Sequence, residues 1–488
     1  MMLSVLLRTA GLVCRQPDAE VSGVTDALSC VKKDSVFVCI CGARFDGHVF
    51  AAEAERKGAV AVIAQTPASA AHCYCVPDSR RAFSLLAAAF YGRPHERLRL
   101  IGITGTNGKT TTAFYLRAML EAAGERCAML GTLGTSVDGK TVETGYTTPK
   151  SDMFFAALQK AADRGCGWAV AEISSQALAQ KRVDGAEFRL GIVTNVGRDH
   201  LDYHGTAVAL AAAKARLCLL SRTVLLNADD RSAPVFYEAA ERAGAEIYDY
   251  SCDPFIPAKK NRFYARNVGG RAQGADLTLC CGAQAYPARI NAPGRFSVYN
   301  ALAAFSAAVL CGVSPALAAE TVKSLPQAPG RAQTVLLHGI RVCVDYAHTP
   351  DALLAILRAL QTDGKKPIAV FGCGGDRDRG KRPLMGRIAA ENAAVVILTS
   401  DNPRGEDPER IISEIAGGIP AGTRVFREPD RRAAIGLALE LASPGDTVLI
   451  AGKGHETSQI IGEEKLPFSD MEEVMQRCRR EEDGNKQR

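Results

Sequence analysis

The chain has 488 residues, of which 47% are hydrophobic and 6% aromatic, and its formal net charge is +6. This length predicts about three domains of roughly 100–200 residues each. Positive and negative residues are interspersed, which argues against a nucleic-acid-binding or membrane-surface protein. No apolar run approaches the roughly 18 residues of a membrane span. The N-terminal run is broken by Arg8 and lacks a small-residue cleavage site, so we expect no signal peptide.

The 16 cysteines are scattered, and the close pairs are Cys39/Cys41, Cys73/Cys75 and Cys280/Cys281. None of these pairs has the Cys-x-x-Cys spacing of a zinc or redox site. We therefore expect free thiols in a protein of the reducing cytoplasm.

Short β-branched runs alternate with Ala/Leu-rich segments of helical period, which indicates an α/β protein with parallel sheets. Polar, Pro-containing segments at 91–98 and 324–335 are interpreted as linkers. Between about 252 and 292, short strands with Gly turns predict an antiparallel appendage. The predicted domains are 1–95, 96–328 and 329–488.

The segment LIGITGTNGKTTTAFYLRAML, which starts at Leu100, combines a strand pattern, a glycine turn and a helix pattern. Such a turn presents backbone N–H groups and a helix N-terminus to an anion. Lys109 would contact the β- and γ-phosphates of a nucleotide, and Thr110 or Thr111 would reach Mg²⁺. Ile103 stands where the ordinary pattern has its first glycine, so the loop is of an unusual kind. The alternative is an ordinary strand–turn–helix with an exposed lysine.

The segment GTNGKTTT, from Gly105, resembles the Mur ligase family of ATP-dependent peptide synthetases. Further motifs resemble that family, in its order, over nearly the whole chain: TTP at 147–149, EISS at 172–175, RDHLDYHG at 198–205, DYAHTPDAL at 345–353, GCGGDRDRGKRPLMG at 372–386, DNPR at 401–404 and AGKGHE at 451–456. The last three resemble the branch that adds the third amino acid to UDP-N-acetylmuramoyl-L-alanyl-D-glutamate. The resemblance implies a small N-terminal α/β uridine-binding domain, a central P-loop-type nucleotide-binding domain with a parallel sheet, and a C-terminal Rossmann-like α/β domain.

The resemblance also implies a ligase reaction in which ATP converts a carboxylate to an acyl phosphate, which an amine then attacks. ATP and Mg²⁺ are the implied cofactors, since cations must offset the charge of two approaching anions. The implied ATP contacts are Gly105, Thr106, Asn107, Gly108, Lys109, Thr110, Thr111, Asn300 and Asp345. The implied catalytic residues are Lys109, Glu172, His200 and Lys214, and the implied metal ligands are Thr110, Glu172, His200 and carbamylated Lys214. Without the resemblance, Glu172 would be interpreted as an exposed turn residue and Lys214 as a solvated helix lysine; the resemblance favours the metal-binding roles instead.

For the UDP-muramoyl dipeptide, the resemblance implies contacts from Thr147, Thr148, Ser174, Gln180 and Arg182. Neutral donors and one Arg suit a diphosphate and carboxylates. Residues 37–64 resemble the uridine-binding domain of the family, but the segment Thr25–Cys30 departs from it. Leu28 stands where the family has serine, and Lys33-Asp34 replaces the usual Pro-Gly. We therefore assign no substrate contact in the first domain.

Three predicted strands of the third domain, PIAVFG, AAVVILTS and TVLIAG, each lead into a polar loop. Loops at the carboxyl ends of parallel strands converge on one crevice. The predicted crevice residues are Arg377, Asp401, Asn402, Pro403, Arg404, Gly452 and Glu456. Guanidinium forks bind carboxylates and acidic groups bind ammonium, so a ligand with both groups at both ends fits. One such ligand is meso-diaminopimelate, and DNPR resembles the motif of diaminopimelate-adding enzymes, whereas lysine-adding relatives lack the Arg.

Two kinds of alternative remain open. One is a ligase of the same fold with another acceptor, either lysine-adding or folylpolyglutamate-forming; Arg404 argues against the first, and the TTP, DNPR and AGKGHE motifs argue against the second. The other is a non-catalytic nucleotide-binding scaffold, against which Lys109, Glu172, His200 and Lys214 argue. We expect a cytoplasmic monomer of peptidoglycan precursor synthesis that binds UDP-N-acetylmuramoyl-L-alanyl-D-glutamate and meso-diaminopimelate, but neither nucleic acid nor membrane.

Overall fold

The structure is a computed structural model that describes residues 1–42, 45–253, 255, 261–271, 274–325, 327–361 and 364–477. Parts of four predicted features lie outside these residues: 43–44 of the uridine-domain motif, 254, 256–260 and 272–273 of the appendage, 326 of the second linker, and 362–363 and 478–488 of the third domain. Within the described chain, no helix has the length and apolar character needed to cross a membrane.

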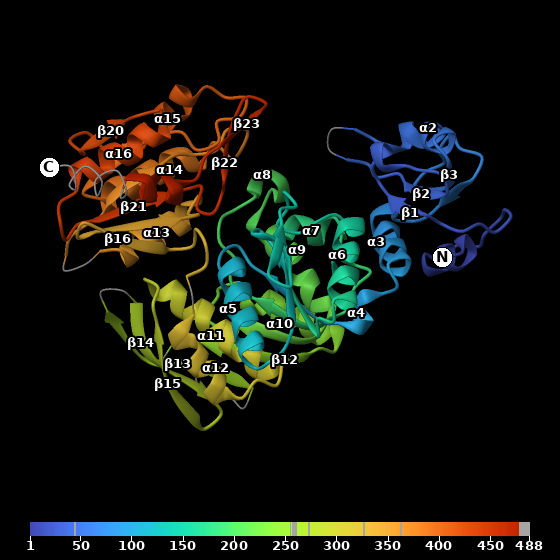
Figure 1. The fold of residues 1–488 in the computed structure, drawn as a ribbon, viewed down its shortest axis with the longest axis horizontal. Helices are drawn as coiled ribbons and strands as arrows, with labels where there is room; N and C mark the ends of the chain where they lie inside the picture. The colour runs from blue at the N-terminus through green and yellow to red at the C-terminus, as the bar shows by residue number, and fades with distance from the viewer. Residues whose placement is uncertain are drawn as a thin grey trace. The chain divides into compact units, whose positions relative to one another are not determined.

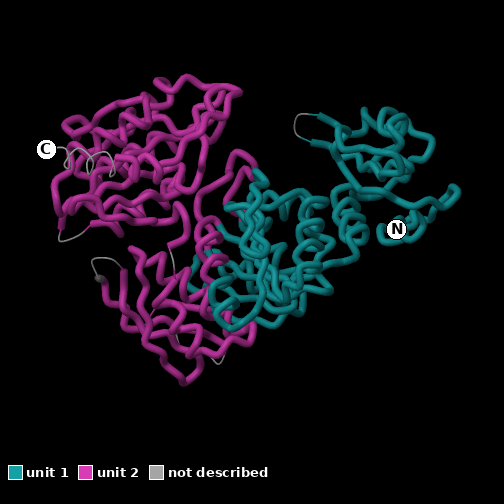
Figure 2. Tube along the Cα trace, viewed as in Figure 1, with its two compact units in different colours: residues 1–105, 116–194, 211–249 teal, residues 106–115, 195–210, 250–488 magenta. Residues whose placement is uncertain are grey.

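Two compact units make up the chain (Figure 2). Unit 1 contains residues 1–105, 116–194 and 211–249, and unit 2 contains residues 106–115, 195–210 and 250–488. The start of the predicted phosphate-loop helix and the loop around His200 therefore belong to the same unit as the C-terminal sheet.

The first sheet of unit 1 is fully parallel, with the order β1-β2-β3-β4. Its elements are α1 (Leu3–Thr9), β1 (Gly23–Thr25), η1 (Leu28–Cys30), β2 (Ser35–Val38), η2 (Gly47–Phe50), α2 (Ala51–Arg56), β3 (Ala59–Ala64), β4 (Cys73–Cys75) and α3 (Ser79–Phe90). Helices α1 and α3 bury Leu3, Leu7 and Leu86 against this sheet. Asp34, which replaces the glycine before β2, has φ 63°, a left-handed conformation that Asp tolerates.

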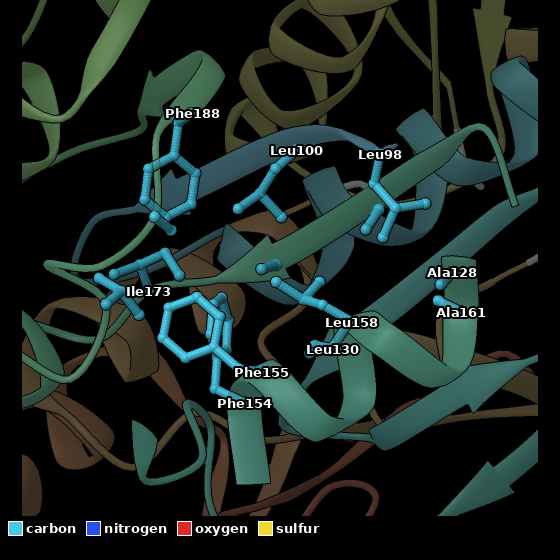
Figure 3. Packing of buried hydrophobic residues seen from close by; sticks show 14 of the residues in the cluster. Leu98, Leu100, Ala128, Leu130, Phe154, Phe155, Leu158, Ala161, Ile173 and Phe188 are labelled. Carbon is cyan, nitrogen blue, oxygen red and sulfur yellow. The ribbon is translucent and has the colours of Figure 1, made fainter. Parts of the chain in front are cut away.

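The second sheet of unit 1 has a parallel core in the order β11-β10-β5-β9-β6, and the antiparallel strands β7 and β8 extend it. Its elements are α4 (Pro94–Arg97), β5 (Arg99–Thr104), α5 (Lys109–Ala122), β6 (Cys127–Gly131), β7 (Gly134–Val137), β8 (Lys140–Val142), α6 (Ser151–Asp163), β9 (Trp168–Glu172), α7 (Ser175–Ala179), β10 (Phe188–Val193), α8 (Leu201–His204), α9 (Ala207–Leu219), β11 (Ser221–Asn227), α10 (Ala233–Ala243) and β12 (Glu246–Ser251). Helices α5 and α9 begin in unit 2, and α8 lies entirely within unit 2. Phe154, Phe155 and Leu158 of α6 pack with Leu100 and Leu130 of the strands (Figure 3). This core fixes the strand ends at which Glu172 and the phosphate loop lie.

Three antiparallel strands of unit 2, β13 (Arg262–Arg271), β14 (Gly274–Cys281) and β15 (Gln284–Ile290), confirm the predicted appendage within the described residues. They are followed by α11 (Arg295–Leu310) and α12 (Pro315–Ser324). Helix α11 is apolar on nearly all sides because it is almost fully buried.

The C-terminal sheet of unit 2 has the order β16-β17-β21-β18-β19-β20 and is parallel except for β16 at its edge (Figure 1). Its elements are β16 (Gln333–Leu337), β17 (Ile340–Asp345), α13 (Pro350–Ala359), β18 (Ile368–Phe371), α14 (Lys381–Asn392), β19 (Val395–Leu398), α15 (Pro408–Ala416), β20 (Val425–Arg427), α16 (Arg431–Leu441) and β21 (Thr447–Ala451). Strands β22 (Ser458–Ile461) and β23 (Glu464–Pro467) form a separate two-stranded antiparallel sheet. Apolar clusters cover both faces, α13, α14 and α15 on one and α16 on the other. The predicted Rossmann-like domain and its three neighbouring parallel strands are confirmed.

All cysteines among the described residues are free thiols, as predicted. Burial raises the pKa of Cys39, and likewise of Cys218, to about 12. Cys30, Cys41 and Cys75 are exposed.

Candidate active site

The phosphate loop joins β5 to α5 through two glycines with positive φ. Gly105 has φ 149° and Gly108 has φ 88°, conformations that residues with a side chain rarely adopt. A Cβ atom at Gly108 would lie 2.3 Å from Oδ1 of Asn300 on α11. The structure therefore brings the loop against Asn300, a predicted ATP contact far away in the sequence.

Lys109 opens α5, and its Nζ donates to the carbonyl oxygen of Thr106 at 3.0 Å. Asn195, which was not predicted, holds the loop from the other side. Its Oδ1 accepts from the backbone N–H of Asn107 at 3.0 Å, and its Nδ2 donates to the Asn107 carbonyl at 3.0 Å. The backbone of the loop is thus held before any phosphate arrives.

Arg331 is a second residue that the sequence did not single out. Its Nη2 donates to Oγ1 of Thr110 at 3.1 Å, and its guanidinium lies 4.4 Å from the ring centroid of Tyr346. Burial raises the pKa of Asp345, whose Oδ2 accepts from the backbone N–H of Ala332 at 2.6 Å. An Arg inside a segment interpreted as a linker was the available signal. Arg331 thus places a cation beside the Thr110 hydroxyl, which was predicted to reach Mg²⁺.

Asp199 and His200 lie in the loop before α8, and His200 Nε2 is 3.4 Å from Asp199 Oδ2. Burial alone would raise the pKa of Asp199, but His348, His200, Lys109 and Lys381 together hold that pKa below its usual value. The phosphate-loop lysine and His200 thus share one electrostatic environment. His348 is also buried, which lowers its pKa.

A cavity of about 210 Å³ in unit 2 collects the predicted amino-acid-binding residues. Its lining includes Arg377, Asp401, Asn402, Arg404, Gly452 and Glu456, all from the loops after β18, β19 and β21. His200 and Tyr346 line the same cavity, whereas Pro403 does not appear in the lining. We call this the acceptor cavity. The convergence of these loops, inferred from parallel-strand geometry alone, is confirmed.

Two arginines of the acceptor cavity, Arg377 and Arg404, form no ion pair among the described residues. Arg404 Nη1 donates to the carbonyl oxygens of Gly375 at 2.9 Å and of Asn402 at 3.4 Å. Arg377 Nη1 donates to the Asp376 carbonyl at 3.0 Å. Burial and the neighbouring Arg377 lower the pKa of Arg404. Neither Arg forms an ion pair with any residue that the structure describes, so an anion would relieve their mutual repulsion.

The acidic groups of the cavity differ from each other. Asp401 is 8% exposed, its Oδ1 accepts from the backbone N–H of Asn402 at 2.7 Å, and it forms no ion pair in the described part of the chain. Glu456 Oε2, in contrast, accepts from Lys453 Nζ and from Asn402 Nδ2, both at 2.8 Å. Lys453 is fully buried and was not predicted. Asp401 is therefore the better partner for an incoming ammonium group.

Glu172 lies at the end of β9 in unit 1 and is only 1% exposed. Its Oε1 accepts from the backbone N–H of Thr132 at 2.9 Å, and its Oε2 accepts from Thr132 Oγ1 at 3.0 Å. A Cβ atom at Gly131 would lie 2.1 Å from Glu172 Oε1. Glu172 is thus a positioned, buried carboxylate, and its interpretation as an exposed turn residue is wrong.

The predicted dipeptide contacts lie close to Glu172. Thr148 Oγ1 donates to the Glu172 carbonyl at 2.8 Å and accepts from the Ser174 backbone N–H at 2.9 Å. Arg182 Nη1 donates to the Thr148 carbonyl at 2.7 Å, and Nη2 donates to Gln180 Oε1 at 2.8 Å. Thr147 Oγ1 is 3.2 Å from the hydroxyl oxygen of Thr132, a neighbour that the sequence did not indicate. Unit 1 therefore gathers all five predicted contacts.

Lys214 lies on α9 and is 2% exposed. Because the side chain is buried, its interpretation as a solvated helix lysine is wrong. Lysines are rarely fully buried, which indicates a specific role for Lys214. The predicted metal ligands divide between the units: Glu172 and Lys214 lie in unit 1, and Thr110 and His200 in unit 2. No three His, Cys, Asp or Glu of the described residues are arranged to hold a metal. The carboxylate of Glu172 and the hydroxyl of Thr110 are each an oxygen donor of the kind that Mg²⁺ prefers.

Three domain models match the chain: the Mur ligase family catalytic domain at 29–91, the Mur ligase middle domain at 103–308, and the Mur ligase glutamate ligase domain at 330–454. The UDP-N-acetylmuramoyl-L-alanyl-D-glutamate--2,6-diaminopimelate ligase of Geobacillus thermodenitrificans is 40% identical over 453 residues, which cover 90% of this chain and 91% of that protein. The Aquifex aeolicus protein of the same name is 41% identical over 458 residues, 93% of each chain. A solved structure of a ligase of that name superimposes with a TM-score of 0.70 at 34% identity, covering 99% of this chain and 100% of that one. The chain belongs to the Mur ligase family.

Proposed function

We propose that this protein is an ATP-dependent ligase that adds meso-diaminopimelate to UDP-N-acetylmuramoyl-L-alanyl-D-glutamate in peptidoglycan precursor synthesis. The observation that carries the proposal is the acceptor cavity, where Arg377 and Arg404 lack an acidic partner and Asp401 lacks a cationic one among the described residues. A diamino dicarboxylic acid supplies both missing charges. The names of the relatives at about 40% identity support the same substrates.

In this reaction, the ATP γ-phosphate passes to a carboxylate of the dipeptide and forms an acyl phosphate. The diaminopimelate amine then attacks the acyl carbon and displaces the phosphate. Lys109 and Arg331 would stabilise the transferring phosphoryl group, because both lie at the phosphate loop. We propose that Gly105, Thr106, Asn107, Gly108, Thr110, Thr111, Asn300 and Asp345 complete the ATP site. Thr110, Glu172, His200 and Lys214 would hold Mg²⁺, which, when bound, offsets phosphate charge. Thr147, Thr148, Ser174, Gln180 and Arg182 would hold the dipeptide substrate.

In the acceptor cavity, Arg404 and Arg377 would bind the distal carboxylate of diaminopimelate, and Asp401 its distal ammonium. The other amine then remains available for attack on the acyl phosphate. Glu456 and Asn402 would support this arrangement through Lys453. We also propose a monomer in the cytoplasm, with domains 1–95, 96–328 and 329–488. Each of these ranges contains one of the family matches.

We propose that Lys214 is carbamylated, because a carbamate replaces a buried cation by an anion suited to Mg²⁺. Protein equilibrated with ¹³C-bicarbonate should show a carbamate ¹³C signal that Lys214→Ala abolishes. Lys214→Ala should lose most of its activity, and formate or acetate should restore part of it. A fully active enzyme with an unmodified lysine amine, measured by intact mass, would contradict this proposal.

The function is tested by phosphate release and product mass with ATP, the UDP-muramoyl dipeptide and a panel of amino acids. We expect release only when ATP, the dipeptide and diaminopimelate are all present, with L-lysine and L-glutamate far less effective. Efficient use of lysine would replace the proposed acceptor. Nucleotide binding without turnover on any amino acid would favour the scaffold alternative.

A further inference from the structure

Two ion pairs in unit 1 connect the first predicted domain to the loops that carry the proposed dipeptide contacts. Lys150 Nζ lies 2.9 and 3.0 Å from the two carboxylate oxygens of Asp26, whose side chain is 13% exposed. Lys181 forms an ion pair with Asp78, and both side chains are about 30% exposed. In each pair, the acid belongs to residues 1–95 and the lysine belongs to residues 96–328.

Both lysines lie close to predicted dipeptide contacts in the sequence. Lys150 follows Thr147-Thr148-Pro149 directly, and Lys181 lies between Gln180 and Arg182. Lys181 has φ 55°, so its side chain leaves the chain at a turn rather than along a helix. Each ion pair is therefore covalently adjacent to residues that contact the dipeptide under the proposed function.

The two acids lie at places that position them well. Asp26 follows β1 directly, at the carboxyl end of a parallel strand, where ligands of α/β sheets bind. Asp78 is the N-cap of α3, and its side chain accepts from the Arg81 backbone N–H. Ser84 of the same helix donates to the Arg182 carbonyl at 3.0 Å and accepts from the Gly185 backbone N–H at 2.9 Å. The Asp78–Lys181 ion pair is thus accompanied by further hydrogen bonds between α3 and residues 182–185.

We propose that Asp26–Lys150 and Asp78–Lys181 form a two-point clamp, which sets the distance between the first domain, which resembles the uridine-binding domain of the family, and the loops that carry the proposed dipeptide contacts. This inference rests on the proposed function, because a substrate with a UDP end and a peptide end must span both parts. A substrate held at one end binds at the other with an effective concentration that depends on a fixed separation. The clamp is a positioning device and contacts no reacting atom.

The test compares Asp26→Lys, Lys150→Asp and the double charge-swap variant, with Asp78→Asn for the second pair because Asn keeps the N-cap acceptor. KM for the UDP-muramoyl dipeptide, ATP and diaminopimelate is measured together with the Kd of the dipeptide by calorimetry. Each single variant should raise the dipeptide KM and Kd about tenfold, and the swap should recover most of that loss. KM for ATP and for diaminopimelate should change by less than about twofold.

The matched control is the Arg97–Asp163 pair, at 2.9 Å, in which both residues belong to residues 96–328. Its side chains are 51% and 54% exposed, and Asp163 lies at the far end of α6 from Lys150. Swapping this pair should change neither KM nor Kd. An unchanged dipeptide Kd in the single variants, or a swap no better than they are, would overturn the clamp. Absence of turnover in the wild type would instead overturn the proposed function, and the calorimetric comparison would still decide on the clamp.

Discussion

Two groups of charged residues flank the C-terminal sheet, and they differ in whether their charges are paired. In the first group, fully buried Arg382 donates to Glu406 at 3.0 and 2.9 Å and to Glu414 at 2.7 Å, and buried Arg431 donates to Asp470 at 2.7 and 2.8 Å.

In the second group, which lines the acceptor cavity, Arg377, Arg404 and Asp401 form no ion pair among the described residues. Arg377 is exposed, but Arg404 is half-buried and Asp401 is buried, and leaving such charges unpaired is costly. Such a cost is tolerated where a ligand supplies the missing partner, so the state of pairing, rather than the residue type, separates binding charges from structural ones.

The largest expected effect is at Arg404. Wild type should prefer diaminopimelate over L-lysine by a factor on the order of 10⁴, because lysine leaves the guanidinium without its carboxylate. Arg404→Ala should remove most of this preference, and Arg404→Lys should not restore it, because a point charge does not reproduce the fork. The measurement is kcat/KM for both amino acids. Arg410→Ala, at an exposed and paired position, is the control and should be neutral. Equal use of both amino acids by wild type would refute the assignment.

The paired group should respond in stability rather than in specificity. Asp470→Ala leaves Arg431 as an uncompensated buried charge and should lower the free energy of unfolding by about 3–5 kcal/mol. Urea unfolding measures the loss. The same change at Asp163, which is half exposed, should cost less than about 1 kcal/mol. If Asp470→Ala unfolds at the wild-type urea concentration, the buried pair does not stabilise the fold.

The phosphate loop adds a further cation, Lys109, to the comparison. Lys109→Ala removes a preorganised positive charge from the transferring phosphoryl group and should lower turnover by a factor on the order of 10² or more. The melting temperature should fall much less than turnover does, because the Lys109 Nζ–Thr106 carbonyl bond lies within the loop itself. Single-turnover phosphate release at saturating substrates is the measurement. Near-normal turnover would remove Lys109 from the mechanism.

The smallest expected effect is a pH dependence of the paired group. The hydrogen bonds from Arg382 hold the pKa of Glu406 at about 2, well below its usual value. Because the unfolded chain binds this proton more readily, the stabilisation is complete above the ordinary Glu pKa of about 4.3 and is lost as pH falls toward 2. Urea midpoints between pH 6 and about pH 3 should fall less for Glu406→Gln than for wild type. Parallel curves would show that other carboxylates control the acid sensitivity.

The sequence predicted what depends on local pattern and on strand geometry. It predicted which loops line the acceptor cavity, because the loops that follow neighbouring parallel strands lie at the same edge of the sheet whatever their own sequences are. The structure explains why the first glycine of the ordinary phosphate-loop pattern is missing: Ile103 is a fully buried position of β5 that pairs with Glu172 of β9 and Ile192 of β10. The strand therefore runs through this position, and the turn begins only at Gly105.

The sequence could not show partners that lie far apart along the chain. Arg331 donates to Thr110 across 221 positions, and Lys453 donates to Asn402 across 51. Thr132, which holds both carboxylate oxygens of Glu172, follows a strand with no motif of its own. The sequence also does not show which charges are paired: Arg382 and Arg377 lie in the same motif, yet Arg382 is buried in α14 against Glu406, whereas Arg377 is exposed in a loop and forms no ion pair among the described residues.

The exposed thiols give the first domain a natural reporter position. Cys30, Cys41 and Cys75 all lie in residues 1–95, and no other cysteine of the described chain is exposed. Thiolates are the reactive species, so buried cysteines with a raised pKa, such as Cys218, react slowly with a maleimide. Among the described thiols, those of the first domain would therefore take up a fluorophore added at low stoichiometry, and with Cys478, which lies outside the described residues, replaced by serine, its emission would follow that domain as the proposed dipeptide substrate is added.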